Sequence, residues 1–480
     1  MKRILGIFRK DVRHLWPQAL LFWAVLGMPA PMNHLLNWGL SLTGGVALAL
    51  QPLACWLLVV SLIHGEALVG HQQYWLTRPY SWKHLMAAKC LFLLVFVNLP
   101  LFVYQLAVLA SEGFSPLDWL YALLWRQVFF TILFVLPAAA LAAVTRNLGQ
   151  VLLAGILLGV TLAAGVGLLM RSGYVDWGGL DWIRDCGTAL VLAAGTTVAL
   201  ALQYSRRRTA VSRAVLAGTL ALTMLVMTAP RWGPAFAIQK LCSRERIRDT
   251  AVRISFDQSR AGTQPQHWGS SSNDPTGVRL EIPMRVEDVP RGVLVGFDWS
   301  SVSIKSPRGT WRSGWLAFQA LHDLSQGAAW LTVYVDPDFY NASLDGAVEL
   351  DGTLDLTLSR SVGTMPLQSR EVLVPEIGMC TYALTVGSYQ LRCSSPFQQA
   401  SVDMVSRSSG FPEQTWRHEA YAPFPTSAGF WPLGQVSSTS WPNTVDYTTL
   451  ALMIHRPVAH VQRDFQLRGL IMPQFKHPQR

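Results

Sequence analysis

The hydrophobic positions divide this 480-residue chain into two halves of different character. Before residue 231, long stretches contain no Asp, Glu, Lys or Arg: 14–65, 90–111, 127–145, 147–170, 186–205 and 214–230. A helix needs about 20 apolar residues to cross a bilayer, and about 17 is the short limit. The first stretch is long enough for two helices, with a break around Pro29 and Pro31. The pattern therefore predicts seven spans, at about 15–32, 44–63, 88–110, 127–145, 150–170, 187–204 and 213–230, of which the last is at the short limit.

Residues 231–480 contain short runs of β-forming residues, several of them alternating between apolar and polar, separated by Gly, Pro and Asp. The predicted strands are 252–256, 278–286, 293–297, 301–304, 329–335, 348–358, 372–374, 382–392, 401–405, 447–454 and 461–467. A helix is expected at 314–324, and the Pro-, Ser- and Thr-rich stretch 420–445 is expected to be a loop. Many short strands between turns are typical of a β-sandwich or barrel. We therefore predict an α-helical polytopic membrane domain at 1–230 followed by an all-β, sandwich-like extracytoplasmic domain at 231–480, built as one large sandwich or two small ones.

The net charge of +10 lies almost entirely in the membrane half, which holds 16 Lys and Arg against 7 Asp and Glu. This distribution argues against a nucleic-acid partner. It indicates instead that the basic residues set the orientation of the chain in the membrane, because cytoplasmic loops carry an excess of Lys and Arg. With the N-terminus inside, thirteen basic residues fall in cytoplasmic segments, and Arg171 and Arg184 fall in outer loops. We therefore expect a multi-pass protein of the bacterial cytoplasmic (inner) membrane, with a cytoplasmic N-terminus and residues 231–480 outside.

Two cysteines give a second indication of orientation. Cys380 and Cys393 flank a run that is typical of a β-hairpin, with its turn near Gly387 and Ser388. A disulfide across the hairpin would fit an oxidising compartment. Two unpaired buried thiols are the alternative.

The first 16 residues have apolar side chains at helical spacing, with basic residues on the other faces. This pattern predicts a basic amphipathic helix on the cytoplasmic lipid surface. A charged flank that only orients the first span is the other interpretation.

The second cytoplasmic loop, residues 65–89, is the most specific local feature. It contains Glu66, then a turn at Pro79 and Ser81 that precedes a short helix ending at Lys89. Ser81 is a favourable N-cap residue. The turn could expose a helix to a cytoplasmic partner, or it could simply lead the chain into the next span.

Residues 1–230 resemble the permease subunits of ABC-type exporters. In that family an amphipathic N-terminal helix precedes about six spans, and the loop between spans two and three holds an acidic residue, a Leu-x-x-x-Pro-x-Ser-like turn and a Lys-terminated helix. Leu76, Pro79, Ser81 and Lys89 match this pattern, and Glu66 stands where the acidic residue is expected.

The resemblance implies that the loop docks on a separate ATPase, with Glu66, Trp75, Leu76, Arg78, Pro79, Ser81, Trp82 and Lys89 as the docking residues. It also implies a homodimer, or a heterodimer with a related permease. The predicted seventh span and the large outer domain depart from the family, and they place simple export in doubt.

The chain contains no Gly-x-x-x-x-Gly-Lys-Ser/Thr loop, so the expected ATP would be bound by the partner subunit and the chain itself holds no cofactor. His418 and Glu419 match the start of the His-Glu-x-x-His motif of zinc proteases, but Ala422 stands where the second histidine is required. No metal or catalytic site is therefore expected.

Arg126, beside an aromatic cluster, is interpreted as a residue that extends to the membrane surface. Gln51, Asn98 and Gln105 are expected to join helices by hydrogen bonds.

Three functions therefore fit the sequence. The first is a permease-like subunit that a separate ATPase energises. The second is a membrane-anchored extracytoplasmic binding or scaffold protein. The third is a membrane enzyme, which no motif in the sequence supports.

Overall fold

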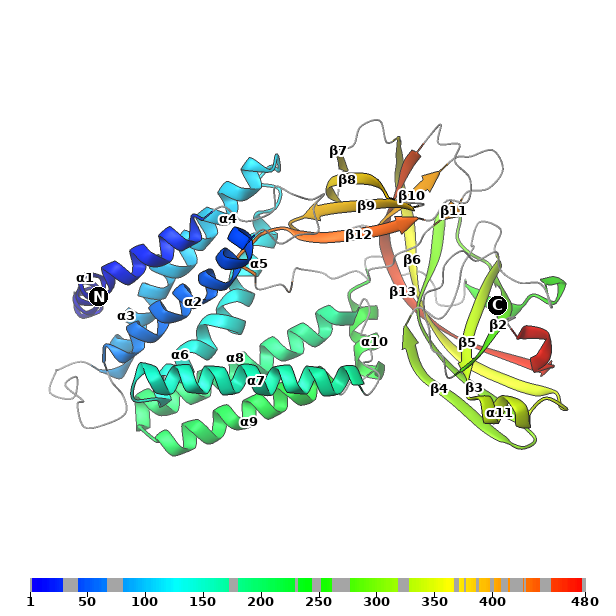
Figure 1. The fold of residues 1–480 in the computed structure, drawn as a ribbon, viewed down its shortest axis with the longest axis horizontal. Coiled ribbons are helices and arrows are strands. Elements are labelled where there is room, and N and C mark those ends of the chain that lie inside the picture. The colour runs from blue at the N-terminus through cyan, green and yellow to red at the C-terminus, as the bar shows by residue number, and fades with distance from the viewer. Residues whose placement is uncertain are drawn as a thin grey trace. The chain divides into compact units, whose positions relative to one another are not determined.

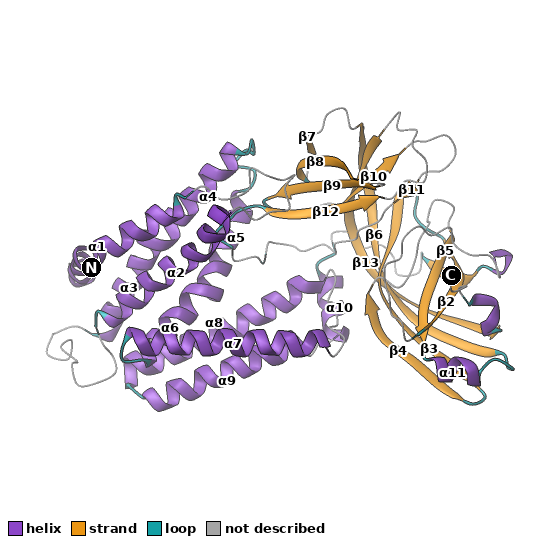
Figure 2. Cartoon of the chain, in the orientation of Figure 1, coloured by secondary structure: helices purple, strands orange, loops and turns teal. Residues whose placement is uncertain are grey.

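The computed structural model describes residues 2–28, 42–66, 81–171, 180–228, 232–243, 252–260, 277–317, 328–366, 371–374, 377–385, 388–397, 401–406, 413–414, 426, 429–440 and 450–476. Contacts divide the chain into two compact units. The helical unit comprises residues 1–174, 182–230 and 424–434, and the β-rich unit comprises 175–181, 231–423 and 435–480. Helices fill the first half of the sequence and strands the second (Figures 1 and 2).

The helical unit contains α1 (Lys2–Leu26), α2 (Leu42–His64), α3 (Trp82–Leu93), α4 (Leu99–Ser111), α5 (Leu120–Phe130), α6 (Leu136–Val144), α7 (Leu148–Arg171), α8 (Asp181–Arg206) and α9 (Thr209–Thr228). Single π-helical turns, η3 (Leu94–Asn98) and η4 (Thr131–Val135), join α3 to α4 and α5 to α6 into two long helices. Five helical segments are long and apolar enough to span a bilayer: Trp82–Ser111, Leu120–Val144, Leu148–Gly165, Asp181–Arg206 and Thr209–Thr228. These coincide with the last five predicted spans.

The first two predicted spans are not confirmed. The expected amphipathic segment and the span at 15–32 form one continuous helix, α1, whose first half carries charged residues and whose described part ends before Pro29. In α2, the described apolar segment is the shorter Ala49–His64. The buried positions Ile7, Leu15 and Phe22 place one face of α1 in the core of the helical unit.

A π-helical turn precedes each of two prolines, Pro100 at the start of α4 and Pro137 at the start of α6. Pro100 has no N–H group to offer the carbonyl four residues earlier. That carbonyl belongs to Phe96, and it accepts a hydrogen bond from Trp23 Nε1 at 3.1 Å. The Trp23 and Phe96 rings also stack with centroids 5.7 Å apart. The irregularity at Pro100 thus becomes an attachment point for α1.

The β-rich unit begins with α10 (Trp232–Leu241), and also contains the short helix α11 (Pro337–Ala342). Its strands are β1 (Arg253–Phe256), β2 (Val278–Glu287), β3 (Val293–Ser306), β4 (Gly309–Ala317), β5 (Ala328–Val335), β6 (Val348–Pro366), β7 (Glu371–Val374), β8 (Gly378–Thr385), β9 (Ser388–Ser395), β10 (Ser401–Ser406), β11 (Glu413–Gln414), β12 (Gly434–Ser440) and β13 (Leu450–Leu470). They form sheets ordered β1-β2-β5, β11-β10-β13-β6-β3-β4 and β12-β9-β8-β7.

Two long antiparallel strands, β6 and β13, hold the β-rich unit together. Their apolar faces share one core with β2, β3 and β5, and the beginning of β13 contributes Leu452 and Ile454 to a second core with β8 and β9. Shifts of register near Pro457 interrupt the pairing of β13 with β6. Such irregularities bend a strand, and a proline, which has no N–H to give to the ladder, is tolerated there.

Most predicted strands are present, but several boundaries were wrong. The runs 293–297 and 301–304 form the single strand β3, and 461–467 joins the end of the run 447–454 in β13. The helix expected at 314–324 is wrong at its start, because Gly309–Ala317 pairs with β3 as β4. Residues 318–324 lie outside the described part. The loop expected at 420–445 contains β12.

Candidate functional site

Four charged side chains from three segments meet in the helical unit. Lys10 and Asp11 lie on α1, Glu66 follows α2, and Lys89 lies on α3. Lys89 Nζ donates to Asp11 Oδ2 at 2.9 Å and to the carbonyl oxygen of Leu62 at 2.9 Å. Lys10 Nζ bonds to Glu66 Oε1 and lies 3.6 Å from Asp11 Oδ1. We call these four residues the charged cluster.

Three of the four residues of the charged cluster are shielded from solvent, whereas the Lys10 side chain is 40% exposed. The exposed fractions are 2% for Lys89, 4% for Asp11 and 8% for Glu66. Removing a charge from water costs several kcal/mol, and a paired charge recovers this cost only where the geometry is good and further hydrogen bonds are made. Lys89 meets these conditions, because it bonds to Asp11 and to the Leu62 carbonyl oxygen, whereas Glu66 Oε2 is buried without a hydrogen-bond partner in the described part of the chain. The cluster holds α1, the end of α2 and α3 together. Glu66 and α3 are thereby both attached to α1.

The predicted docking residues fall into three groups. Trp75, Leu76, Arg78 and Pro79 lie outside the described residues. Ser81 and Trp82 are exposed, whereas Glu66 and Lys89 form ion pairs inside the helical unit. Ser81 is confirmed as the N-cap of α3, because its Oγ accepts a hydrogen bond from the backbone N–H of His84 at 3.4 Å.

Sequence reasoning missed Asp11, which pairs with Lys89. A signal was present: Asp11 is the only acidic residue before Glu66. It also follows the buried Ile7 by four residues and precedes the buried Leu15 by four, so it lies on the apolar face of α1. A lone carboxylate on such a face needs a cationic partner.

A second set of polar side chains lies between the helix that contains α4 and the helix that contains α5. Gln127 Nε2 donates to Gln105 Oε1 at 2.9 Å, and Asn98 Nδ2 donates to Thr131 Oγ1 at 2.7 Å. The expectation that Gln105 and Asn98 join helices is therefore confirmed. Gln105, Gln127 and Arg126 are all buried, with exposed fractions of 1%, 9% and 5%.

Arg126 does not extend to the surface as the sequence suggested. Its guanidinium donates to the carbonyl oxygen of Trp431, which belongs to the part of the chain 424–434 that packs in the helical unit. The physical reason is that this segment brings main-chain acceptors to the buried charge, so that the arginine need not reach water. We call its described residues, Thr426 and Gly429–Leu433, the return segment.

Further contacts attach the return segment to the helices. Gln105 Nε2 donates to the carbonyl oxygens of Gly429 at 3.3 Å and Phe430 at 3.0 Å. The Phe430 ring packs edge-on to Phe130 and Phe134, with centroids 5.1 and 5.9 Å apart. Thr426 Oγ1 donates to Asp185 Oδ2 on α8 at 2.9 Å.

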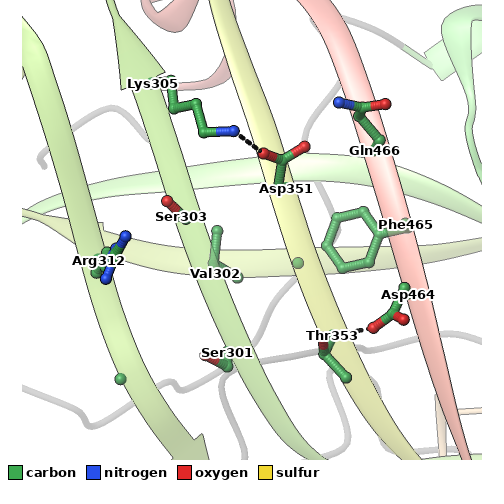
Figure 3. A pocket seen from close by; sticks show the side chains of 12 residues that line it. Ser301, Val302, Ser303, Lys305, Arg312, Asp351, Thr353, Asp464, Phe465 and Gln466 are labelled. Atoms are coloured by element: carbon green, nitrogen blue, oxygen red, sulfur yellow. Dashed lines mark hydrogen bonds and ion pairs between the residues drawn. The ribbon is translucent and has the colours of Figure 1, made fainter.

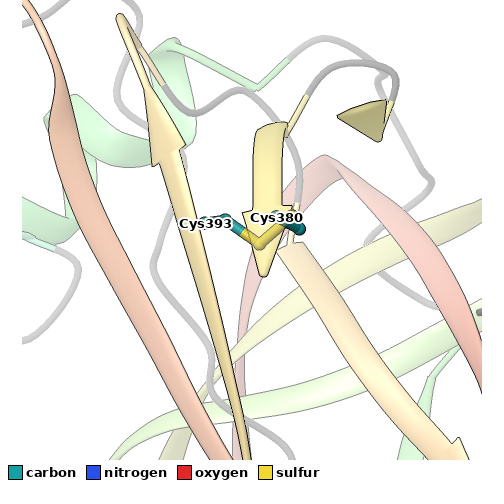
Figure 4. The surroundings of a disulfide bond; sticks show 2 residues. All are labelled: Cys380 and Cys393. Atoms are coloured by element: carbon teal, nitrogen blue, oxygen red, sulfur yellow. A yellow bond between two sulfur atoms is a disulfide. The ribbon is translucent and has the colours of Figure 1, made fainter. Parts of the chain in front are cut away.

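The β-rich unit contains the predicted disulfide. Cys380 on β8 lies directly opposite Cys393 on β9, with Cα atoms 4.0 Å apart, and the two sulfurs are bonded (Figure 4). The predicted hairpin is confirmed, since β8 and β9 pair from Met379 and Ser394 to Thr385 and Ser388. The two residues that join the strands, 386 and 387, lie outside the described part.

Replacing Cys380 by serine is expected to reduce the free energy of unfolding of the β-rich unit by about 3 kcal/mol, because the cross-link no longer restricts the unfolded chain. Thermal unfolding of the purified full chain, with and without reductant, measures this change. Reductant should lower the midpoint of the original chain and leave that of Cys380→Ser unchanged. Two free thiols in protein isolated from its own membrane, found by mass analysis of unreduced peptides, would contradict the prediction.

Buried carboxylates lie on β3 and β6. Asp298 accepts a hydrogen bond from Thr357 Oγ1, and the same hydroxyl lies 3.0 Å from His460 Nδ1. His460 Nε2 lies 2.9 Å from Gln239 Nε2 on α10. These contacts form a continuous chain if His460 is neutral, with Nδ1–H donating to Thr357 and Nε2 accepting from Gln239. Burial raises the pKa of Asp298 to about 7, against the lowering effect of Thr357. Burial and the charge of Asp298 also raise the pKa of Asp355.

A pocket of about 700 Å³ lies on the six-stranded sheet (Figure 3). Its polar side chains come from four adjacent strands: Arg312 on β4, Ser301, Ser303 and Lys305 on β3, Asp351 and Thr353 on β6, and Asp464 and Gln466 on β13. Lys305 Nζ lies 2.5 Å from Asp351 Oδ2, and Thr353 Oγ1 donates to Asp464 Oδ1 at 2.6 Å. Hydroxyl, amide and charged groups of both signs could bind a polar ligand there.

Within the described residues, no three His, Cys, Asp or Glu side chains are placed to hold a metal ion. His418, Glu419 and Ala422 lie outside those residues. Comparison of the chain with protein-family models, curated proteins and solved structures finds no match.

Proposed function

We propose that this chain is the permease-like membrane subunit of an ATP-driven exporter, energised by a separate ATPase that docks on the cytoplasmic loop 65–89. The charged cluster is the observation that carries this proposal. Its ion pairs, Lys10 with Glu66 and Lys89 with Asp11, attach both ends of the loop to α1. A loop that transmits force from a partner to membrane helices needs such a firm connection.

The buried positions of Glu66 and Lys89 give them a specific role in this proposal. They hold the loop in position, while Ser81, Trp82 and the residues between 67 and 80 supply the surface that meets the ATPase. Trp82 has an exposed fraction of 36%, and Lys83 Nζ lies 5.9 Å from the centre of its ring. An exposed aromatic–cation pair of this kind is a suitable anchor for a partner.

The proposed orientation places the N-terminus in the cytoplasm and the β-rich unit outside a bacterial inner membrane. The excess of Lys and Arg in the proposed inside segments supports it. The disulfide supports it independently, because disulfides persist in oxidising compartments. In this proposal α1 and α2 complete a set of seven spans, the β sheets pack as a sandwich, and the working unit is a homodimer or a heterodimer with a related permease.

Co-purification tests the proposal. Full-length chain captured from its native membranes should bring an ATPase with it, and Glu66→Ala should reduce recovery several-fold because it removes the ion pair that attaches the start of the loop to α1. Ser81→Pro should have a similar effect, because proline removes the cap of α3. Glu112→Ala, at the C-cap of α4, is the matched control and should behave like the original chain.

Formation of the Cys380–Cys393 disulfide verifies that the β-rich unit of each variant folds, and thermal unfolding verifies that the helical unit does. If the original chain recovers no ATPase, or if Glu66→Ala and Ser81→Pro both retain it fully, the permease proposal is wrong. The pocket on the six-stranded sheet favours the second candidate, a membrane-anchored protein that binds a polar ligand outside the membrane without transport.

A further inference from the structure

The polar side chains of α4 and α5 bind the main chain of the return segment rather than its side chains. Gln105 donates to two consecutive carbonyl oxygens of the return segment, and Arg126 donates to the third. The Phe430 side chain from the same stretch packs against Phe130 and Phe134. Residues 430–432 form a bend. Carbonyl oxygens are common to every peptide, so this pattern selects a bent stretch of main chain and one aromatic side chain, whatever the rest of the sequence.

The return segment fills this site incompletely. Within the described part of the chain, Arg126 Nε and Gln127 Oε1 are buried and make no hydrogen bond. The Trp431 indole N–H is also buried and makes no hydrogen bond. A buried polar group without a hydrogen-bond partner costs about 1–3 kcal/mol. The site therefore has one unused donor and one unused acceptor, and the main chain of a peptide offers a carbonyl and an N–H group that match them.

We propose that Gln105, Arg126 and Gln127, together with Phe130 and Phe134, form a receptor site for a peptide that bends at an aromatic residue. In this proposal residues 429–431 occupy the site as a built-in ligand that a second peptide can displace. Polar residues in apolar helices are costly and mark functional sites. Such a site would let a peptide outside the membrane release the return segment from the helices.

The built-in ligand should weaken the binding of any added peptide. Its effective concentration is high because it belongs to the same chain, and an added peptide binds only to the fraction of molecules in which the site is vacant. Phe430→Ala removes the aromatic contact from the return segment and leaves every helix residue of the site in place. This substitution should therefore open the site without damaging it.

The test uses full-length chain in lipid nanodiscs and a fluorescein-labelled peptide with the sequence of residues 426–434, Thr-Ser-Ala-Gly-Phe-Trp-Pro-Leu-Gly. Fluorescence anisotropy should show at least tenfold tighter binding to Phe430→Ala than to the original chain. Phe339→Ala, which removes a partly buried phenylalanine of the β-rich unit, is the matched control and should bind like the original chain. Adding Arg126→Met to Phe430→Ala should weaken binding at least tenfold.

Three results would overturn the proposal: equal binding to the original chain and to Phe430→Ala, no binding to Phe430→Ala, or equal binding of a peptide with alanine in place of its phenylalanine. If Arg126→Met does not fold, as judged by disulfide formation and thermal unfolding, Gln105→Ala replaces it. Unchanged binding to that variant also refutes the site. No ATPase enters these measurements, so their outcome is separate from that of the co-purification.

Discussion

Asp11→Asn is expected to lower the free energy of unfolding of the helical unit by about 3–5 kcal/mol. The substitution keeps the shape of the side chain but removes its charge. Lys89 then stays buried and loses its charged acceptor, while its hydrogen bond to the Leu62 carbonyl oxygen remains. Breaking a buried ion pair from one side leaves an uncompensated charge in apolar surroundings, and this accounts for the size of the effect.

The partner variant should behave differently. Lys89→Met leaves the carboxylate of Asp11 within 3.6 Å of Lys10 Nζ, so its charge keeps a partner. We therefore expect a smaller loss than for Asp11→Asn. The double variant Asp11→Leu/Lys89→Met removes both charges and should recover most of the stability, because apolar residues of similar size can replace a buried pair.

Thermal unfolding of the purified chain in detergent, compared across these variants, provides the measurement. Asp118→Asn, an exposed position in the same unit, is the matched control. A double variant as unstable as Asp11→Asn would show that the cluster contributes something other than paired charge, and the ion-pair explanation would be wrong.

Raising the pH from below 4 to above 7 is expected to destabilise the β-rich unit through Asp298. The pKa of Asp298 is about 7 in the folded chain and 3.8 for an ordinary aspartate. Between these values the unfolded chain loses a proton that the folded chain keeps, so stability falls as the pH rises. Each unit of pKa difference corresponds to about 1.4 kcal/mol, so the loss is roughly 4 kcal/mol.

Asp298→Asn should remove this pH-dependent step, because an amide does not ionise in this range. The difference in unfolding midpoint between the original chain and Asp298→Asn, measured at pH 5 and at pH 8, isolates the contribution. Asp345→Asn, on an exposed turn, controls for the loss of an aspartate elsewhere. Parallel pH profiles for the original chain and Asp298→Asn would contradict the assignment. Asp355, whose pKa is also raised, remains present in both chains.

Local sequence determined the elements that depend only on near neighbours. Charge-free apolar stretches predicted seven spans, and five of them are helices long and apolar enough to cross a membrane, because helix formation and bilayer thickness are local constraints. Alternating residues predicted most strands, and the spacing of Cys380 and Cys393 predicted the hairpin and its disulfide. Ser81 was identifiable as a cap because its hydrogen bond closes over three residues.

Only the tertiary structure decided which distant residues meet. Asp11 and Lys89 are 78 positions apart, and Arg126 and Trp431 are 305 apart. No local pattern predicts such pairings, because their energy comes from burial that exists only after the helices pack. The same reason explains β4: residues 314–317 had a helical pattern, but pairing of Gly309–Ala317 with β3 satisfies their backbone as a strand. Sequence could place Arg126 in an apolar helix, but its acceptor lies in the return segment, which only the packed helices bring to it.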